Sequence, residues 1–487
     1  MKRKMILKLV SFCAVFLLLF VAVSGVIKPK WLARDSMWEP ATLIEEGFYA
    51  EPENSLDVIC IGSSHVFLDI SPMAMWKAEG ITAYDLTSSI QRMWVSYYYL
   101  KEALKYQTPK VVVLDALAVH MDEYNDEDRN RKAHDYMKLS PEKIESVKNS
   151  IDPEGEESLT SYLFPVMRYH DRWKELSESD FTFFSKEKNY FAKGYDLNFQ
   201  SVPYTGPADY MQPSEEVVSF GEKSGQFLQK IVDLCKEKNI ALQLVKTPYA
   251  YWNTAQSNGV KAFADKNSVD FLDLNLHLSE MGVDWAVDSS DGGGHMNIAG
   301  AEKVSRFLGK YLKDRYALPD RRGDSAYRQW SLEEQVYDAE KAAGMLSREA
   351  DPSVYLPQLK NKDYLVFVSA KGAAASAAGE NGKALSSLGM SRKLKDGNNY
   401  AAVLYNGRPL YEDRSENPVD YFSEDCGGQK VHLKSQPDAS GGSSVRINGK
   451  EYSKNADGIN IVVYSMRLER VIDTANLNGL ASPQMLR

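Results

Sequence analysis

A serine and a distant histidine are the residues of this 487-residue chain that best suit chemistry. Ser64 lies in the run Gly62-Ser63-Ser64-His65, directly after the apolar stretch 56–61, which is typical of a buried parallel strand. A small-residue turn that feeds a helix exposes a hydroxyl beside free backbone N–H groups, which can stabilise an oxyanion. Because a serine becomes nucleophilic only when a base removes its proton, a histidine must lie nearby in the fold.

Among the seven histidines, only His295 lies in a loop rich in Gly and Asp just before the last amphipathic stretch of this region, 298–312. The same loop carries Asp288 and Asp291, and either carboxylate could orient the imidazole. Sites in open α/β sheets lie just past the carboxyl ends of strands. We therefore expect Ser64 and His295 to form a nucleophile–base pair. The alternative for the serine run alone is a tight turn with no chemical role.

The elements that must position these residues alternate between strand and helix from about 51 to 317. This alternation predicts a parallel sheet with helices on both faces. The region 120–210 breaks the rhythm, is rich in charge and aromatics, and is expected to be an insertion or cap. The patterns indicate strands at 56–61, 81–86, 110–115, 240–246 and 269–274, and helices at 96–106, 214–238 and 298–312.

The chain changes character after residue 317. A charged linker over 318–349 leads into a polar helix, and from 350 to 480 short apolar runs alternate with Gly, Asn and Ser. The pairs Asn406-Gly407 and Asn448-Gly449 are strong hairpin signals. We expect a separate β-rich domain here, with strands near 364–369, 400–405 and 459–464.

The N-terminus carries one candidate membrane span, the uncharged run Leu9 to Ile27. At 1.5 Å per residue it reaches about 28 Å, close to the hydrocarbon thickness of a bilayer. Basic residues precede it, so the positive-inside bias places everything after Lys28 outside the cytoplasm. A cleaved signal peptide is the alternative, although its apolar core is usually shorter. We therefore expect a cytoplasmic stub and anchor at 1–30 and a linker at 31–50.

Composition excludes several classes of protein. A content of 44% hydrophobic residues excludes a fully disordered chain, and the net charge of -9 argues against nucleic acid as a partner. Four cysteines do not make a disulfide scaffold. The sequence has no CxxC or HExxH pattern and no glycine-rich phosphate loop after a strand, so we expect no metal and no cofactor.

The motifs GSSH at 62–65 and HMNIAGAEK at 295–303 resemble the SGNH (GDSL-type) hydrolases. The resemblance covers about 51–317 and is closest to the membrane-anchored, extracytoplasmic branch found beside membrane-bound O-acyltransferases (MBOAT). It implies a flavodoxin-like three-layer α/β domain in a single-pass protein of the bacterial cell membrane, with Ser64 as nucleophile and His295 as general base. The family usually places its acid three residues before the histidine, which here is Gly292. The loop must therefore bulge for Asp291, which we favour, or Asp288 to serve.

The resemblance also bears on the oxyanion hole and the substrate. Gly62 and Ser63 belong to the first motif and Asn297 to the second. The family's second glycine is missing, so the backbone N–H of Ser89 is expected to replace it, and the family's asparagine after 110–115 is absent. An incomplete hole fits a weak hydrolase or a transferase better than a fast esterase. Trp252, which follows a predicted strand, could stack on a sugar ring or belong to the core.

The C-terminal region has a resemblance of its own. YLVFVSAKG at 364–372 and INGKEYSKNADGINIVVY at 447–464 are similar to the interleukin-like EMT inducer (ILEI) domain. That β-sandwich-type domain also forms the carbohydrate-binding stem of a glycosyltransferase. The resemblance implies glycan binding, with a structural spacer or a protein-docking module as the alternative.

These features together predict a membrane-anchored, extracytoplasmic serine esterase or O-acyltransferase. It would act on O-acyl groups of cell-surface polysaccharide through an acyl-Ser64 intermediate. The resemblance implies an MBOAT protein as the source of the acyl group, and the lipid bilayer would hold residues 9–27. The alternatives are a non-catalytic glycan-binding or assembly scaffold and, if the N-terminus is cleaved, a secreted esterase.

Overall fold

A computed structural model describes residues 2–30, 41–182, 191–437, 440–478 and 484–486. The chain divides into two compact units, Met1–Glu334 and Gln335–Arg487. The boundary falls within the range predicted as a linker, 318–349. Helix α15 (Arg328–Leu346) runs through this boundary.

The first unit is built on a parallel sheet in the order β2-β1-β3-β4-β5, the doubly wound order. Its strands are short and almost fully buried, because helices cover both faces. From β1 the chain moves to β2 at one side and then returns to β3 at the other, so the strand order reverses between β1 and β3. The strands are β1 (Val58–Gly62), β2 (Ala83–Thr87), β3 (Val111–Asp115), β4 (Ala241–Lys246) and β5 (Asp270–Asp273).

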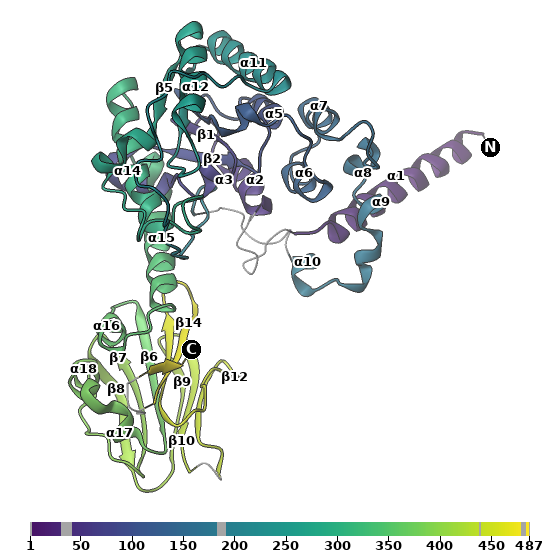
Figure 1. Cartoon of the computed structure of the whole chain (residues 1–487). Helices are drawn as coiled ribbons and strands as arrows, with labels where there is room; N and C mark the ends of the chain where they lie inside the picture. Colours follow the sequence, from purple (N-terminus) through teal and green to yellow (C-terminus); the bar gives the residue numbers. More distant parts are fainter. Residues whose placement is uncertain (1, 31–40, 183–190, 438–439, 479–483, 487) are drawn as a thin grey trace. The chain divides into compact units, whose positions relative to one another are not determined.

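Helices flank this sheet, among them α5 (Met93–Ala103), α11 (Glu222–Lys238) and α14 (Ile298–Tyr316) (Figure 1). Helix α4 (Pro72–Glu79) packs against α14, and α5 packs against α11. Right-handed crossovers in opposite directions along the sheet place α4 and α5 on opposite faces. Helix α12 (Thr254–Asn267) covers β5, after which come η4 (Leu274–His277) and α13 (Leu278–Met281).

The helix predicted over 214–238 is wrong in its first eight residues. Gly221 is the N-cap of α11, and the preceding segment is not helical. The N–H of Val218 donates to the carbonyl of Ala255, and Val217 is 60% exposed. This segment lies along α12, so its valines do not form the apolar face of a helix.

The region predicted as an insertion consists of short helices between β3 and α11. Side-chain caps at Asp126 and Ser140 begin two of them. The helices are η1 (Leu117–His120), α6 (Glu127–His134), α7 (Pro141–Ser150), α8 (Leu159–Leu163), α9 (Val166–Tyr169), η2 (His170–Lys174) and α10 (Glu178–Thr182).

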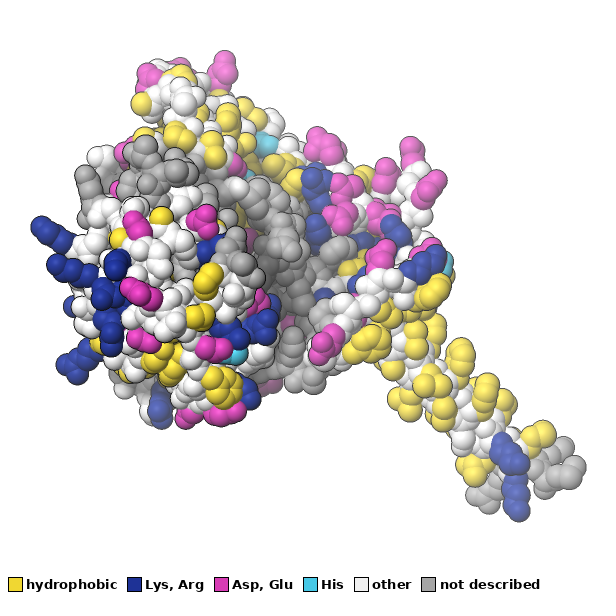
Figure 2. Space-filling view, turned by 90° about the horizontal axis from the view of Figure 1, so that it is seen from below, with side chains coloured by type: hydrophobic (Ala, Val, Ile, Leu, Met, Phe, Trp, Pro, Cys, Tyr) yellow, Lys and Arg dark blue, Asp and Glu magenta, His cyan; other side chains and the backbone are white. Residues whose placement is uncertain are grey.

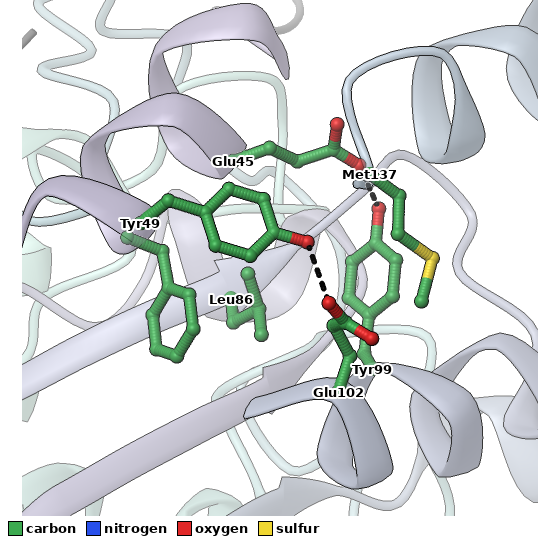
Figure 3. A pocket seen from close by; sticks show the side chains of 7 residues that line it. Glu45, Tyr49, Leu86, Tyr99, Glu102 and Met137 are labelled. Carbon is green, nitrogen blue, oxygen red and sulfur yellow. Dashed lines mark hydrogen bonds between the residues drawn. The ribbon is translucent and has the colours of Figure 1, made fainter. Parts of the chain in front are cut away.

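Two helices precede the sheet. Helix α1 (Lys2–Ile27) contains the stretch Lys4–Ile27, which is long and apolar enough to cross a bilayer, as a signal sequence can also be. Helix α2 (Ala41–Ala50) forms within the range predicted as a linker, of which 31–40 lie outside the described residues. Helix α2 packs against β2. Its side chains line a small buried cavity with those of α5 (Figure 3).

The second unit consists of two antiparallel sheets, ordered β15-β14-β13-β6-β7-β8 and β12-β11-β10-β9. One core lies between the sheets and includes Phe367 and Val431. A second core lies under the helices, which are α16 (Pro352–Gln358), α17 (Ala374–Ala378) and α18 (Gly382–Ser387). The strands are β6 (Tyr364–Lys371), β7 (Asn399–Tyr405), β8 (Arg408–Ser415), β9 (Val419–Cys426), β10 (Gln429–Ser435), β11 (Ser443–Ile447), β12 (Lys450–Glu451), β13 (Gly458–Ser465), β14 (Arg470–Asn478) and β15 (Gln484–Leu486).

The coarse fold prediction is confirmed: a parallel α/β unit is followed by an antiparallel β-rich unit, after one apolar N-terminal helix. Both predicted hairpin turns are present. Asn406-Gly407 joins β7 to β8 and Asn448-Gly449 joins β11 to β12, with positive φ at all four residues, as a tight hairpin turn of this sequence requires.

Candidate active site

Ser64 begins the short helix α3 (Ser64–Phe67) directly after β1, where the strand order reverses. Gly62 ends the strand. A residue with a side chain would not fit there, because its Cβ would lie 2.6 Å from Val66 Cγ2 and 2.8 Å from Asp115 Cβ. Ser63 is the extended N-cap of the helix. The first N–H groups of a helix have no partner within it, so Ser64 combines a hydroxyl with nearby donors.

The loop before α14 bulges so that Asp291 reaches His295. Gly292 and Gly293 adopt φ values of 82° and 102°, which side-chain-bearing residues rarely adopt. The backbone N–H groups of Gly294 and His295 then donate to Asp291 Oδ1 at 2.9 and 2.8 Å. This turn compensates for the extra residue between the carboxylate and the histidine.

Ser64, His295 and Asp291 form one hydrogen-bonded chain. His295 Nε2 lies 2.8 Å from Ser64 Oγ, and its Nδ1 lies 2.6 Å from Asp291 Oδ2. Burial would raise the pKa of Asp291, but the hydrogen bond and charge of His295 and two backbone N–H groups outweigh it and lower that pKa. Asp291 is therefore ionised at neutral pH, and the arrangement has the order of nucleophile, base and orienting carboxylate.

An extended segment over 196–204 holds the histidine loop in place. The N–H of Gly292 donates to the carbonyl of Val202 at 3.0 Å, and the N–H of Ile298 donates to that of Asn198 at 2.7 Å. Sequence reasoning missed this segment, which carries no apolar periodicity. It lies within the predicted insertion, 120–210, so the insertion is hydrogen-bonded to the histidine loop.

A buried polar cluster lies behind the reactive pair, at the carboxyl ends of β1, β3 and β4. Lys246 Nζ lies 3.7 Å from Asp115 Oδ1 and 3.5 Å from His65 Nδ1. Asp69 lies 3.3 Å from His65 Nδ1 and accepts the N–H of Met296, the residue after His295, at 2.8 Å. The cluster thereby ties the histidine loop to the end of α3.

His65, the residue after Ser64, is buried. Only 3% of it is exposed, and its ring lies 4.7 Å from that of His295. Burial lowers the pKa of His65 well below its usual value, and the charge of Lys246 lowers it further. Burial raises the pKa of Asp69 to about 6. Sequence reasoning missed Asp69 and Lys246, although Lys246 ends a predicted strand.

Three other candidates have different partners. Asp288 lies away from the imidazole and accepts from Lys303 Nζ at 2.6 Å. Asn297 caps α14 and accepts the N–H groups of its first turn. Trp252 is 1% exposed and donates to Asp273 Oδ2 at 3.1 Å, so its indole belongs to the core and cannot stack on a sugar ring.

Two buried hydroxyl groups without hydrogen-bond partners in the described part of the chain lie near Ser64 in the sequence or at the adjacent strand end. Ser63 Oγ and Thr87 Oγ1 are buried and have no hydrogen-bond partner among the described residues. Thr87 pairs with Gly62, the residue before Ser63, at the ends of β2 and β1. Ser89 lies in the turn just after β2 and is half-buried; its role as an N–H donor stays a prediction.

Tyr251 offers an exposed aromatic ring beside the histidine loop. It is 61% exposed, and its hydroxyl donates to the carbonyl of Gly292 at 3.1 Å. Tyr249, next to it, packs edge-on against His65 at 4.7 Å between ring centroids. This part of the site therefore presents an aromatic surface to a ligand.

The sequence matches no model of a known protein family, and it matches none of the curated proteins.

Proposed function

We propose that the protein is a membrane-anchored, extracytoplasmic serine acyl-esterase or O-acyltransferase of the SGNH type, acting on O-acyl groups of cell-surface polysaccharide. The observation that carries this proposal is the hydrogen-bonded chain Ser64–His295–Asp291 at the strand-order reversal. Such a chain suits covalent acyl transfer, because the histidine can remove the proton of the serine hydroxyl and the carboxylate orients the histidine.

In the proposed mechanism, His295 Nε2 removes the proton of Ser64 Oγ as the oxygen attacks an acyl carbonyl. Asp291 holds the imidazole through Nδ1 and stabilises its positive charge. The oxyanion is held by backbone N–H groups around Ser64. His295 returns the proton to the leaving group, and the acyl-Ser64 ester remains. A sugar hydroxyl, or water, is then deprotonated by His295, attacks the ester and releases Ser64.

The proposed acyl donor is supplied by an MBOAT protein, and the acceptor is a glycan. Tyr251 supports a sugar ligand, because an exposed aromatic ring can cover the apolar face of a pyranose. The second unit, which we propose to be ILEI-like, has a polar pocket on its smaller sheet. Its lining includes side chains that can bind hydroxyl groups, namely Lys434, Gln436, Ser444, Arg446 and Glu451.

The test is trapping of the acyl-enzyme. The full chain in detergent is incubated with p-nitrophenyl acetate and digested, and its peptides are measured by mass spectrometry. We expect an acetyl group on the Ser64 peptide, absent in Ser64→Ala and strongly reduced in His295→Ala. His277→Ala is the matched control, since His277 lies on η4 and pairs with Glu280. No adduct and no ester turnover in the wild type would favour the non-catalytic glycan-binding scaffold.

A further inference from the structure

Four large apolar side chains are exposed between the end of α8 and α10, in the part of the chain that contacts α1. Phe164, Met167, Trp173 and Phe181 are 44%, 56%, 64% and 61% exposed. Single exposed apolar residues are ordinary on a protein surface, but several within one short segment mark an interaction site. We call residues 159–182, from α8 to α10, the interfacial segment.

The interfacial segment is fastened to the end of α1. Helices α9 and α10 and the turn η2 between them contact α1. The guanidinium of Arg172 donates to the carbonyl of Ile27 and also pairs with Asp180 at 3.0 Å. Lys30 lies 3.9 Å from the same carboxylate. These polar contacts lie at the level where the apolar run of α1 ends.

Aromatic packing extends the contact between the interfacial segment and α1 from Ile27 toward the N-terminus of α1. The rings of Phe164 and Phe20 lie 5.8 Å apart. Phe20 precedes Ile27 by two turns, so it lies about 10 Å further along the apolar helix. If the hydrocarbon boundary lies where α1 becomes polar, near Ile27, a side chain packed on Phe20 lies within the hydrocarbon.

We propose that the interfacial segment inserts its apolar side chains into the outer leaflet of the lipid bilayer, as a second membrane contact beside α1. Hydrophobic side chains cover α1 and continue where α1 meets the rest of the first unit (Figure 2). Trp173 is of a type enriched at the membrane interface. Arg168 and Lys174 are also exposed, at 52% and 62%, and they pair with Glu127 and Asp171.

This second contact would restrict the tilt of the first unit on the membrane. A single helix leaves an attached domain free to tilt and rotate, whereas two contacts joined by Arg172 and Asp180 fix it. The inference rests on the proposed anchoring by α1, and it does not depend on catalysis.

The test uses nitroxide labels on the full chain in vesicles of POPE and POPG. Native Cys13 reports on α1; it is exposed there, whereas the three other cysteines are buried. In a Cys13→Ser background, labels are placed at Phe164→Cys and Trp173→Cys. Val217→Cys is the matched control, because Val217 is a similarly exposed apolar residue beside α12. Collision with oxygen, which partitions into lipid, is compared with collision with a water-soluble nickel complex.

We expect oxygen to dominate at positions 13 and 164, the nickel complex to dominate at 217, and position 173 to be intermediate. Labels at 164 and 173 that collide with nickel as freely as at 217, while 13 stays in lipid, would overturn the inference and leave the anchor intact. Exclusion of both reagents at 164 and 173 would also overturn it, because a protein would then cover the segment. A label at 13 that lies in water would remove the anchor itself.

A second measurement avoids new cysteines. Brominated lipids quench tryptophan fluorescence only at close range, so the wild type should lose more fluorescence in them than Trp173→Phe does. Equal losses in the two proteins would count against lipid contact at Trp173.

Discussion

At the scale of single residues, the site depends on which carboxylate orients His295. From the sequence, Asp291 is favoured and Asp288 is the alternative. The choice depends on the backbone of Gly292 and Gly293, whose positive φ values let a carboxylate four residues away fold back onto the imidazole. A composition pattern shows that glycines are present but not which way the loop turns.

We predict that Asp291→Asn lowers kcat for ester turnover by about 10²- to 10⁴-fold. The amide can still fill the space, but it cannot stabilise the imidazolium or enforce the tautomer that accepts the serine proton. The measurement is initial-rate kinetics with p-nitrophenyl acetate, with circular dichroism as the check on folding.

Asp288→Asn is the matched control for that prediction. Asp288 lies in the same loop but pairs with Lys303, so turnover per folded molecule should stay within a few-fold of wild type. If the two variants lost activity equally, Asp291 would not be the orienting carboxylate.

The direction in which the side chain of Trp252 points could not be predicted from the sequence. An aromatic residue just after a strand at the site edge can face either the ligand or the core. Its hydrogen bond to Asp273, from a neighbouring strand, is a tertiary contact that no local pattern encodes. The surroundings of His65 are likewise tertiary, since Lys246 lies on β4 and His295 in the loop before α14.

At the scale of elements, the predicted strands agree with the structure because buried parallel strands leave continuous apolar runs. Segments in which apolar residues do not recur at a regular spacing were not predictable in this way. The segment 196–204 forms no regular element, yet it holds the histidine loop. Helix α2 was expected to be linker, although it is anchored by polar contacts in a buried site.

Those contacts make α2 sensitive to pH. Tyr99 donates to Glu45 at 2.7 Å and Tyr49 to Glu102 at 3.3 Å (Figure 3). Burial raises the pKa of Glu45 from 4.5 to about 8, against the hydrogen bond of Tyr99 and the charge of Lys143. The second oxygen of Glu45 has no hydrogen-bond partner among the described residues. The side chain is therefore protonated in the folded protein at neutral pH.

We predict that the free energy of unfolding of the first unit falls as pH rises from about 5 to 8. Over this range the unfolded chain ionises Glu45 while the folded chain keeps the proton, which costs up to about 1.4 kcal/mol per pH unit. Glu45→Gln cannot ionise and should flatten the slope, whereas Glu53→Gln, at an exposed position, should not. Urea unfolding at pH 5, 6, 7 and 8 measures this. Equal slopes in all three proteins would contradict it.

At the scale of the whole molecule, the chain comprises two units with separate cores. The change from helical to β-rich patterning located this division in the sequence, since each unit has its own spacing of apolar residues. The sequence could not place it to the residue, because α15 continues through the boundary without a break.

We predict that each unit unfolds in its own transition. Phe367→Ala removes a fully buried ring from between the sheets of the second unit and should cost about 3–5 kcal/mol. Leu114→Ala removes a fully buried side chain of β3 and should cost about 2–5 kcal/mol. Pulsed hydrogen exchange with mass spectrometry, across a urea series, should show each change only in peptides of its own unit. A shift in both sets of peptides would mean a single cooperative unit.

The distance along the chain between nucleophile and base has a consequence for biosynthesis. Ser64 and His295 meet across 231 residues of sequence, and His295 is placed only when the loop before α14 has formed. A ribosome makes the N-terminal end first, so Ser64 is synthesised long before His295. The hydrogen-bonded chain Ser64–His295–Asp291 therefore cannot form until nearly the whole first unit has been synthesised and folded.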